Sequence, residues 1–249
     1  MALIFFIWAM KTDKSYLWFF IPVFLLFAFL SKQVPAIYIL FSIILVMIFH
    51  LIQQPRKKSY KIILLLSSSS LLLFIFLFLF YQFNSIDIKN FLTQYLLYPS
   101  TIGAERYEKV NYDFKNTILN FKFIYFALFF LVYFTIKNLK ERKNFYKDIN
   151  FKVCLICVFL FLSMIQHIIV TKNQIFIFFL IPLFIGFAHI QLINLSINFK
   201  KYFSLILIIF CIGTTLKYHY RFNIDRKFHE LSNVKFSESI KSEILSKKF

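Results

Sequence analysis

The sequence predicts an all-α, polytopic integral membrane protein with about seven transmembrane helices. Of its 249 residues, 60% are hydrophobic, and the mean hydropathy is +0.72. Only three glycines and five prolines interrupt the chain, so the apolar residues form long continuous runs. Soluble domains are not composed in this way, whereas a helix that crosses a bilayer needs about 20 apolar residues.

Seven apolar segments approach or reach that length. They run from Tyr16 to Ser31, Val34 to Ile52, Lys61 to Phe83, Ile118 to Ile136, Val153 to Thr171, Ile175 to Leu195 and Phe199 to Leu216. We expect them to form one helical bundle over residues 1–216, with a long outer connection over residues 84–117. A polar, basic tail follows over residues 217–249.

The basic residues predict how the bundle is oriented, because lysine and arginine are retained on the cytoplasmic side. The connection containing Arg56 carries a charge of +4, and residues 137–152 hold six basic against two acidic side chains. Both should be cytoplasmic. The connection over residues 84–117 has no net charge and should lie outside. By alternation the turns at Lys32 and Lys172 are also outside, as is the tail, although its charge of +4 opposes that placement.

The formal charge of +18 does not indicate nucleic-acid binding. The basic residues lie in short connections between apolar runs and in the tail, which is the pattern that orients membrane proteins. We therefore expect a multi-pass protein of the plasma (inner) membrane, with membrane lipid as its partner and no nucleic acid.

The first residues form an apolar stretch that is shorter than a span. Ala2 to Met10 covers nine residues, about half a crossing at ~1.5 Å per residue. Alternation predicts that it is the inner half of a helix whose outer half precedes Met1. We therefore expect a truncated or split reading frame, with an N-terminal half encoded separately.

Several smaller features are expected to be structural. Ile86 to Tyr98 has the apolar spacing of a short helix on the outer interface. The four serines from Ser67 to Ser70 lie within a span, where small residues allow helices to pack closely. His50 and His189 approach the inner interface, and we expect both to be structural. The three cysteines, which are Cys154, Cys157 and Cys211, lie inside apolar runs and are expected to be membrane-embedded thiols.

Polar and basic residues gather at the predicted outer ends of the helices. They are Lys32, Gln33, Glu105, Arg106, Gln166, His167, Lys172, Tyr218, His219 and Arg221. Lysine, arginine and histidine there have the charges to hold a phosphate group. The alternative is that these side chains only reach lipid headgroups. The tail residues His219, Asp225, His229 and Glu230 match no metal-ligand spacing, so the sequence identifies no metal, no cofactor and no catalytic residue.

Two segments resemble a known family. Leu30-Ser31-Lys32-Gln33-Val34-Pro35 is similar to the Leu-Ser/Thr-Lys-Gly element of polytopic, lipid-linked-sugar glycosyltransferases of the C-type fold, with Gln33 in place of the usual glycine. This is the superfamily of the aminoarabinose and protein-mannosyl transferases. Lys172 is followed by Phe176 and Pro182, which resembles the family's second lysine element. The order also agrees, because Arg106 lies in a long outer connection between the two lysines.

The resemblance implies transfer of a sugar from a polyprenyl-phosphate carrier at the outer face of the membrane. It covers only the C-terminal half of such an enzyme, because the family's catalytic acid lies in a first outer loop that has no counterpart here. It therefore implies a fragment or subunit that supplies the phosphate side, and it leaves open whether the chain is itself an enzyme. By analogy, Lys172, Lys32, Arg106 and the neighbouring His167 would bind the lipid phosphate.

Two other functions stay open. The first is a non-catalytic membrane scaffold that accompanies another subunit. The second is a transporter or lipid flippase, which would usually place polar residues or broken helices at mid-membrane, often in repeated halves. The predicted spans are almost wholly apolar at their centres and show no internal repeat, so the sequence favours this reading least.

Overall fold

The computed structural model describes residues 1–12, 14–98, 112–140, 142–171, 177–195 and 199–226, and within these ranges every regular element is a helix. The longer helices are α1 (Ala2–Thr12), α2 (Ser15–Ser31), α3 (Gln33–Ile52), α4 (Arg56–Phe83), α8 (Lys122–Leu139), α9 (Ile149–Thr171), α10 (Ile177–Ile193) and α11 (Lys200–Arg226). The short ones are α5 (Ile88–Leu92), η1 (Thr93–Leu97), α7 (Phe114–Thr117), η2 (Leu119–Phe121) and η3 (Phe145–Lys147).

Among the described residues, five helices are long and apolar enough to cross a membrane, which confirms the predicted all-helical class and supports a membrane protein. They cover Gln33–Ile52, Arg56–Phe83, Leu119–Leu139, Ile149–Val170 and Lys200–Tyr220. The other two predicted spans correspond to α2 and α10, which have 17 residues each and contain Pro22 and Pro182. At ~1.5 Å per residue each extends only about 26 Å, so these two are short against a ~30 Å hydrocarbon core.

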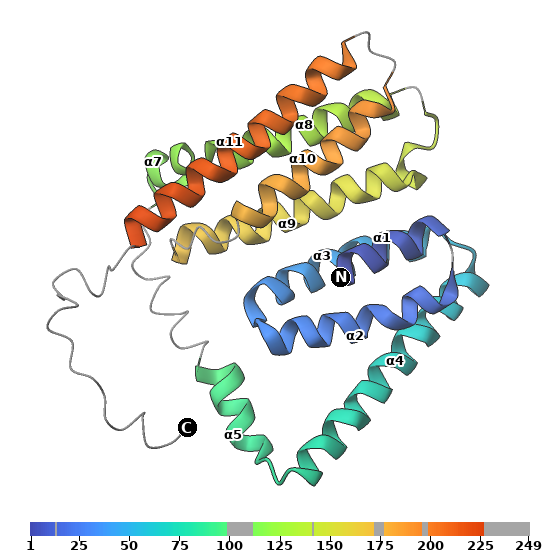
Figure 1. Ribbon diagram of the computed structural model, residues 1–249. Coiled ribbons are helices and arrows are strands. Elements are labelled where there is room, and N and C mark those ends of the chain that lie inside the picture. Colours follow the sequence, from blue (N-terminus) through green and yellow to red (C-terminus); the bar gives the residue numbers. More distant parts are fainter. Residues whose placement is uncertain (13, 99–111, 141, 172–176, 196–198, 227–249) are drawn as a thin grey trace, which may run out of the picture.

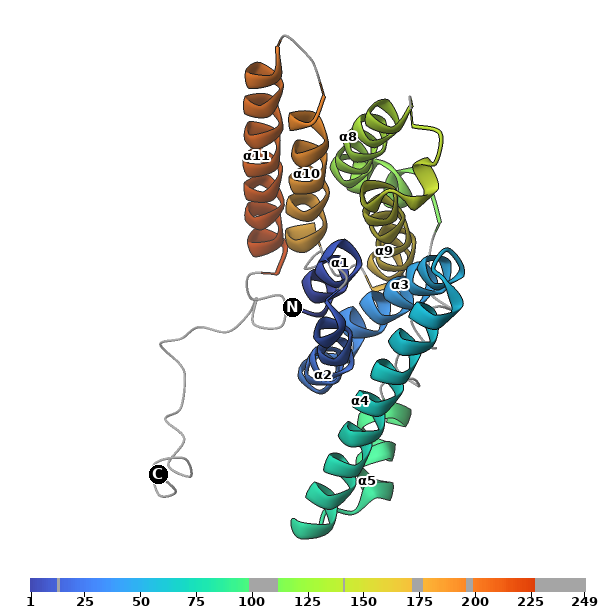
Figure 2. The same cartoon turned by 90° about the vertical axis from the view of Figure 1, so that its right-hand side faces the viewer.

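The helices form two groups that meet along one line. The first group contains α1 to α4 and the second α8 to α11, as the two perpendicular views show (Figure 1, Figure 2). Within them, α2 packs against α1, α3 and α4, and α10 packs against α8 and α11. Helix α9 packs against α3 and α1, and it is therefore the element that joins the two groups.

Helix α9 also lies at the centre of the core. Its side chains Ile156, Leu160, Met164 and Ile168 are fully buried, and their spacing of four residues keeps them on one face of the helix. Of its most apolar window 56% is buried, against 11% for α4. Helix α4 instead extends away from the bundle, with α5 beside its far end (Figure 2).

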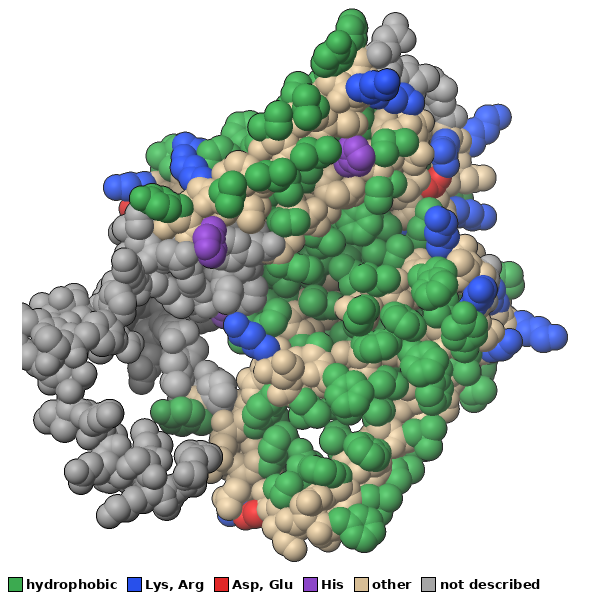
Figure 3. Space-filling view, in the orientation of Figure 1, with side chains coloured by type: hydrophobic (Ala, Val, Ile, Leu, Met, Phe, Trp, Pro, Cys, Tyr) green, Lys and Arg blue, Asp and Glu red, His purple; other side chains and the backbone are tan. Residues whose placement is uncertain are grey.

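The two ends of the bundle differ in charge. At one end of the bundle, α1, α3, α8 and α10 finish and α2, α4, α9 and α11 begin. We call this the basic end. Lys and Arg side chains gather there, on the right of the space-filling view (Figure 3). One of them, Arg142, pairs with Asp148 before α9, and Gln53 donates a hydrogen bond to the backbone of Tyr146 (3.1 Å).

Several local expectations can be compared directly with the structure. The segment Ile86 to Tyr98 is helical, as α5 and η1. Of the four serines, Ser69 is buried and its hydroxyl donates to the carbonyl of Phe19 in α2 (2.6 Å), a close packing contact between α4 and α2. Helix α11 continues to Arg226, beyond the predicted end of the last span at Leu216.

Candidate functional site

A polar contact joins α3 and α9 at the end of the bundle opposite the basic end. The Tyr38 hydroxyl lies 3.0 Å from His167 Nδ1, and the two rings meet edge to face with their centroids 5.5 Å apart. Both side chains are half-buried. A tyrosine hydroxyl can donate to Nδ1 or accept from it, so in either tautomer this contact fixes the plane of the imidazole.

Lys32 lies at the same end, in the turn between α2 and α3. It ends α2 and precedes α3, and its side chain is exposed. Tyr38 follows it by six residues, about 9 Å along the helix axis at ~1.5 Å per residue. The exposed ammonium group of Lys32 is therefore one to two helical turns from the Tyr38–His167 pair.

The turn that carries Lys32 is held in place by η1. Tyr95 donates its hydroxyl hydrogen to the carbonyls of Phe29 (2.6 Å) and Leu30 (2.7 Å). Gln33 in turn donates its side-chain amide to the Tyr95 carbonyl. These bonds satisfy backbone carbonyls that the end of a helix leaves without an intrahelical partner, and they fix the position of the turn.

Helix α9 carries a second polar side chain beside His167. The amide of Gln166 donates to the hydroxyl of Tyr112 (2.9 Å), which belongs to the predicted outer connection. Elements far apart in sequence therefore contribute polar groups to one end of the bundle.

Of the four residues predicted to bind phosphate, two lie in the described part of the chain and two do not. Lys32, in the turn before α3, and His167, on α9, lie at the same end of the bundle, where α3 and α9 pack against each other. Lys172 and Arg106 fall outside the described residues. Tyr38 and Tyr95 were missed, because a tyrosine in an apolar run gives no signal that its hydroxyl will meet a histidine or close a turn.

A different polar cluster lies at the basic end. Lys152 Nζ is 2.8 Å from His50 Nδ1, and the Trp18 ring stacks on the His50 ring at 5.6 Å. All three side chains are almost fully buried, with exposed fractions of 1% to 3%. An ammonium group can only donate, so a charged Lys152 requires Nδ1 to accept and the ring proton to be on Nε2. Because the three side chains pack against one another inside the bundle, we interpret the cluster as structural, which is also what the sequence led us to expect for His50.

The described residues contain no group of three side chains that could hold a metal ion. The cysteines Cys154, Cys157 and Cys211 are free thiols within α9 and α11. Of the four tail residues considered as ligands, His229 and Glu230 lie outside the described residues.

No family model, curated protein or solved structure matches this chain.

Proposed function

We propose that this chain is a seven-span protein of the plasma (inner) membrane that binds a polyprenyl phosphate at the outer face. In this proposal it is a fragment or subunit of a lipid-phosphate-sugar-dependent glycosyltransferase and supplies the phosphate side of the reaction. The catalytic acid or base would come from a separately encoded part.

The charge distribution supports an orientation in which the end of the bundle that carries Lys32 lies at the outer face. The basic end carries the connections with the largest excess of lysine and arginine, and such connections stay in the cytoplasm. The opposite end, with Lys32 and the Tyr38–His167 pair, is then the outer face. The tail is placed outside by the same alternation.

The observation that carries the proposal is the Tyr38–His167 pair beneath the exposed Lys32. A polar pair that joins two helices inside an apolar bundle costs free energy unless it has partners, and such groups often mark functional sites in membrane proteins. Tyr38 fixes the imidazole plane, while Lys32 contributes a flexible point charge. A lipid phosphate at this end of the bundle would meet both groups.

The proposed chemistry needs positive charge at this position. When a sugar leaves its carrier, the bond between the anomeric carbon and the phosphate oxygen breaks, and the electron pair stays on the phosphate. Fixed positive charge stabilises the negative charge that develops. Lys32, and His167 when protonated, would supply that charge together with Lys172 and Arg106.

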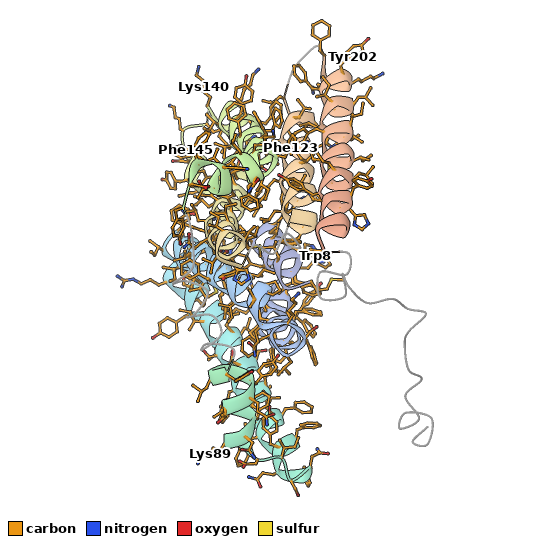
Figure 4. All side chains as sticks on the ribbon, turned by 90° about the vertical axis from the view of Figure 1, so that its left-hand side faces the viewer. Trp8, Lys89, Phe123, Lys140, Phe145 and Tyr202 are labelled. Atoms are coloured by element: carbon orange, nitrogen blue, oxygen red, sulfur yellow. The ribbon has the colours of Figure 1, made fainter. Side chains whose placement is uncertain are left out.

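A binding measurement tests the proposal. The purified chain in vesicles is titrated with a radiolabelled polyprenyl phosphate, and Lys32→Ala and His167→Ala are compared with wild type. We expect each variant to bind about fivefold more weakly, because each contact is worth about 1 kcal/mol and 1.4 kcal/mol is tenfold. Lys89→Ala is the matched control, since Lys89 is exposed on α5, at the far end of α4 (Figure 4). Wild-type affinity in both test variants would overturn the proposal.

A non-catalytic scaffold is the second candidate, and one observation favours it. Helix α4 leaves a long apolar face uncovered, including the exposed side chains Leu64, Leu72, Phe74 and Phe76, which a helix of a partner subunit would cover. Co-purification of a stable membrane partner, with no lipid-sugar turnover by the pair, would support this function over the first.

A further inference from the structure

We propose that the groove between α8 and α11 binds one phosphate-bearing membrane lipid. Its phosphate would occupy a basic cavity at the end of the groove, and its hydrocarbon chain would lie against aromatic side chains farther along. This site shares no residue with the Lys32 and His167 site and does not depend on the glycosyltransferase proposal.

The cavity proposed for the phosphate has a volume of about 300 Å³. It does not lie at the basic end defined above but at the other end of the bundle. Three lysines line it, namely Lys115 of α7, Lys122 at the start of α8 and Lys217 of α11. All three side chains are exposed. Asn120 adds a polar group, and no acidic side chain is among the described residues that line the cavity.

Two of these lysines lie close to the same aromatic ring. Lys122 Nζ and Lys217 Nζ lie 5.5 Å and 5.0 Å from the centre of the Phe123 ring. Phe123 is between α8 and α11 (Figure 4) and meets Tyr218 edge to face at 5.8 Å. The Tyr218 hydroxyl donates to the carbonyl of Asn120 (2.8 Å), which fixes α11 against the residues before α8.

This arrangement favours an anion. Ammonium groups that share one cavity repel each other, and the face of a single phenyl ring offsets only about 0.5–1 kcal/mol per exposed cation. A phosphate between the lysines would convert that repulsion into charge-assisted hydrogen bonds. Three lysines from three elements give such an anion contacts on several sides.

The groove continues along the same two helices. Helix α10 packs against both α8 and α11, while the described residues that line the second cavity come from α8 and α11 themselves. A second cavity of about 260 Å³ lies there, lined mainly by Phe129, Phe130, Tyr133, Phe203 and Leu207. Between the two cavities, Phe130 of α8 meets Phe210 of α11 at 5.8 Å.

The dimensions fit a lipid better than a free anion. Tyr133 follows Lys122 by eleven residues, about 16 Å along α8, so the groove offers a long apolar surface to a chain whose head is at Lys122. Both helices are long and apolar enough to cross a membrane, and their ends therefore lie near the lipid phosphates. Lys137 is the one basic side chain among the described residues that line the second cavity, so the cavity with three lysines is the better phosphate site.

Native mass spectrometry of the full chain released from neutral detergent tests the inference. The probes are phosphatidic acid, phosphatidylcholine and inorganic phosphate. The double variant Lys122→Gln/Lys217→Gln removes two charges from the cavity. The matched control Lys140→Gln/Lys143→Gln removes two exposed charges at the basic end. Ile206→Trp fills the groove from an exposed position, since Ile206 lines the second cavity and is 55% exposed.

We expect wild type and control to retain phosphatidic acid more strongly than phosphatidylcholine. The double variant should bind phosphatidic acid at least tenfold more weakly, and Ile206→Trp should weaken phosphatidic acid while leaving inorganic phosphate unchanged. Unchanged lipid binding in the double variant would overturn the site. Equal affinity for phosphatidic acid and inorganic phosphate, with no effect of Ile206→Trp, would overturn the lipid and indicate a site for a free anion.

Discussion

Lysine side chains have different environments at the two ends of the bundle. The difference distinguishes a lysine that is part of the packed interior from lysines that line a cavity with room for a ligand. At the basic end, Lys152 is 3% exposed and packs against His50 and Trp18. At the opposite end, Lys122 and Lys217 are exposed around an open cavity. A buried lysine that is hydrogen-bonded to a buried partner is part of the packing, because its loss leaves that partner unsatisfied, whereas exposed lysines that share a cavity have room for a ligand. Position in the sequence distinguishes neither, because all three lie next to apolar runs.

The largest expected effect is on the buried cluster. Trp18→Ala should destabilise the protein by about 3–5 kcal/mol, because it empties a fully packed site and removes the ring that stacks on His50. Thermal unfolding in detergent measures the change. Trp8→Ala is the control, since Trp8 is 42% exposed on α1. Equal losses in the two variants would mean that the cluster has no special role in stability.

The second prediction compares the same substitution at the buried lysine and at a lysine that lines the cavity. Lys152→Met should cost about 1–3 kcal/mol, because a buried hydrogen-bonding atom of His50 loses its lysine partner, and it should leave phosphatidic acid binding unchanged. Lys122→Met should do the reverse, with weaker lipid binding and an unchanged unfolding temperature. Both variants are measured by thermal unfolding and by lipid titration. If both change the same quantity, the distinction between the two ends fails.

A smaller effect is expected where α3 meets α9 at the opposite end. Tyr38→Phe removes only the hydroxyl that contacts His167 at 3.0 Å, and a hydrogen bond between helices in a membrane is worth about 0.6 kcal/mol on average. Stability should therefore fall slightly. The affinity for polyprenyl phosphate should fall with it if the orientation of His167 matters for binding. Tyr60→Phe, on the exposed side of α4, is the control for losing a tyrosine hydroxyl.

The smallest effect is expected at the contact between α2 and α4. Ser69→Ala removes the bond from the Ser69 hydroxyl to the Phe19 carbonyl (2.6 Å) and should cost about 0.5 kcal/mol. Ser70→Ala should cost nothing measurable, because Ser70 is exposed. A larger loss for Ser70 than for Ser69 would show that the serines do not act by packing α4 on α2.

The helical class and the membrane spans could be predicted because they depend on local composition. A long apolar run satisfies its own backbone groups in lipid by forming a helix. The count of seven was harder, since α2 and α10 are short and contain Pro22 and Pro182. Length alone does not settle whether such a helix crosses the bilayer.

The sites were only partly predictable, because they depend on which helices become neighbours. The positions of His167 and Lys32 at helix ends could be predicted from the sequence, while their role in phosphate binding stays a prediction. The contact of His167 with Tyr38, and that of Lys152 with His50, require α3 and α9 to pack together, and no sequence pattern predicts that pairing. The cavity of Lys115, Lys122 and Lys217 likewise appears only when α11 lies beside the start of α8.

The distance along the helices between the two contacts of α3 with α9 can be compared with the thickness of a membrane. Tyr38 and His50 are twelve residues apart on α3, and Lys152 and His167 are fifteen apart on α9, which corresponds to about 18 Å and 22 Å along the helices. Both lengths are shorter than the ~30 Å hydrocarbon core of a typical bilayer. Both contacts therefore fit within the depth of such a core, where polar side chains need protein partners because lipid offers none. The two contacts also fix how far α3 and α9 are displaced along each other, so sliding one helix past the other would break both.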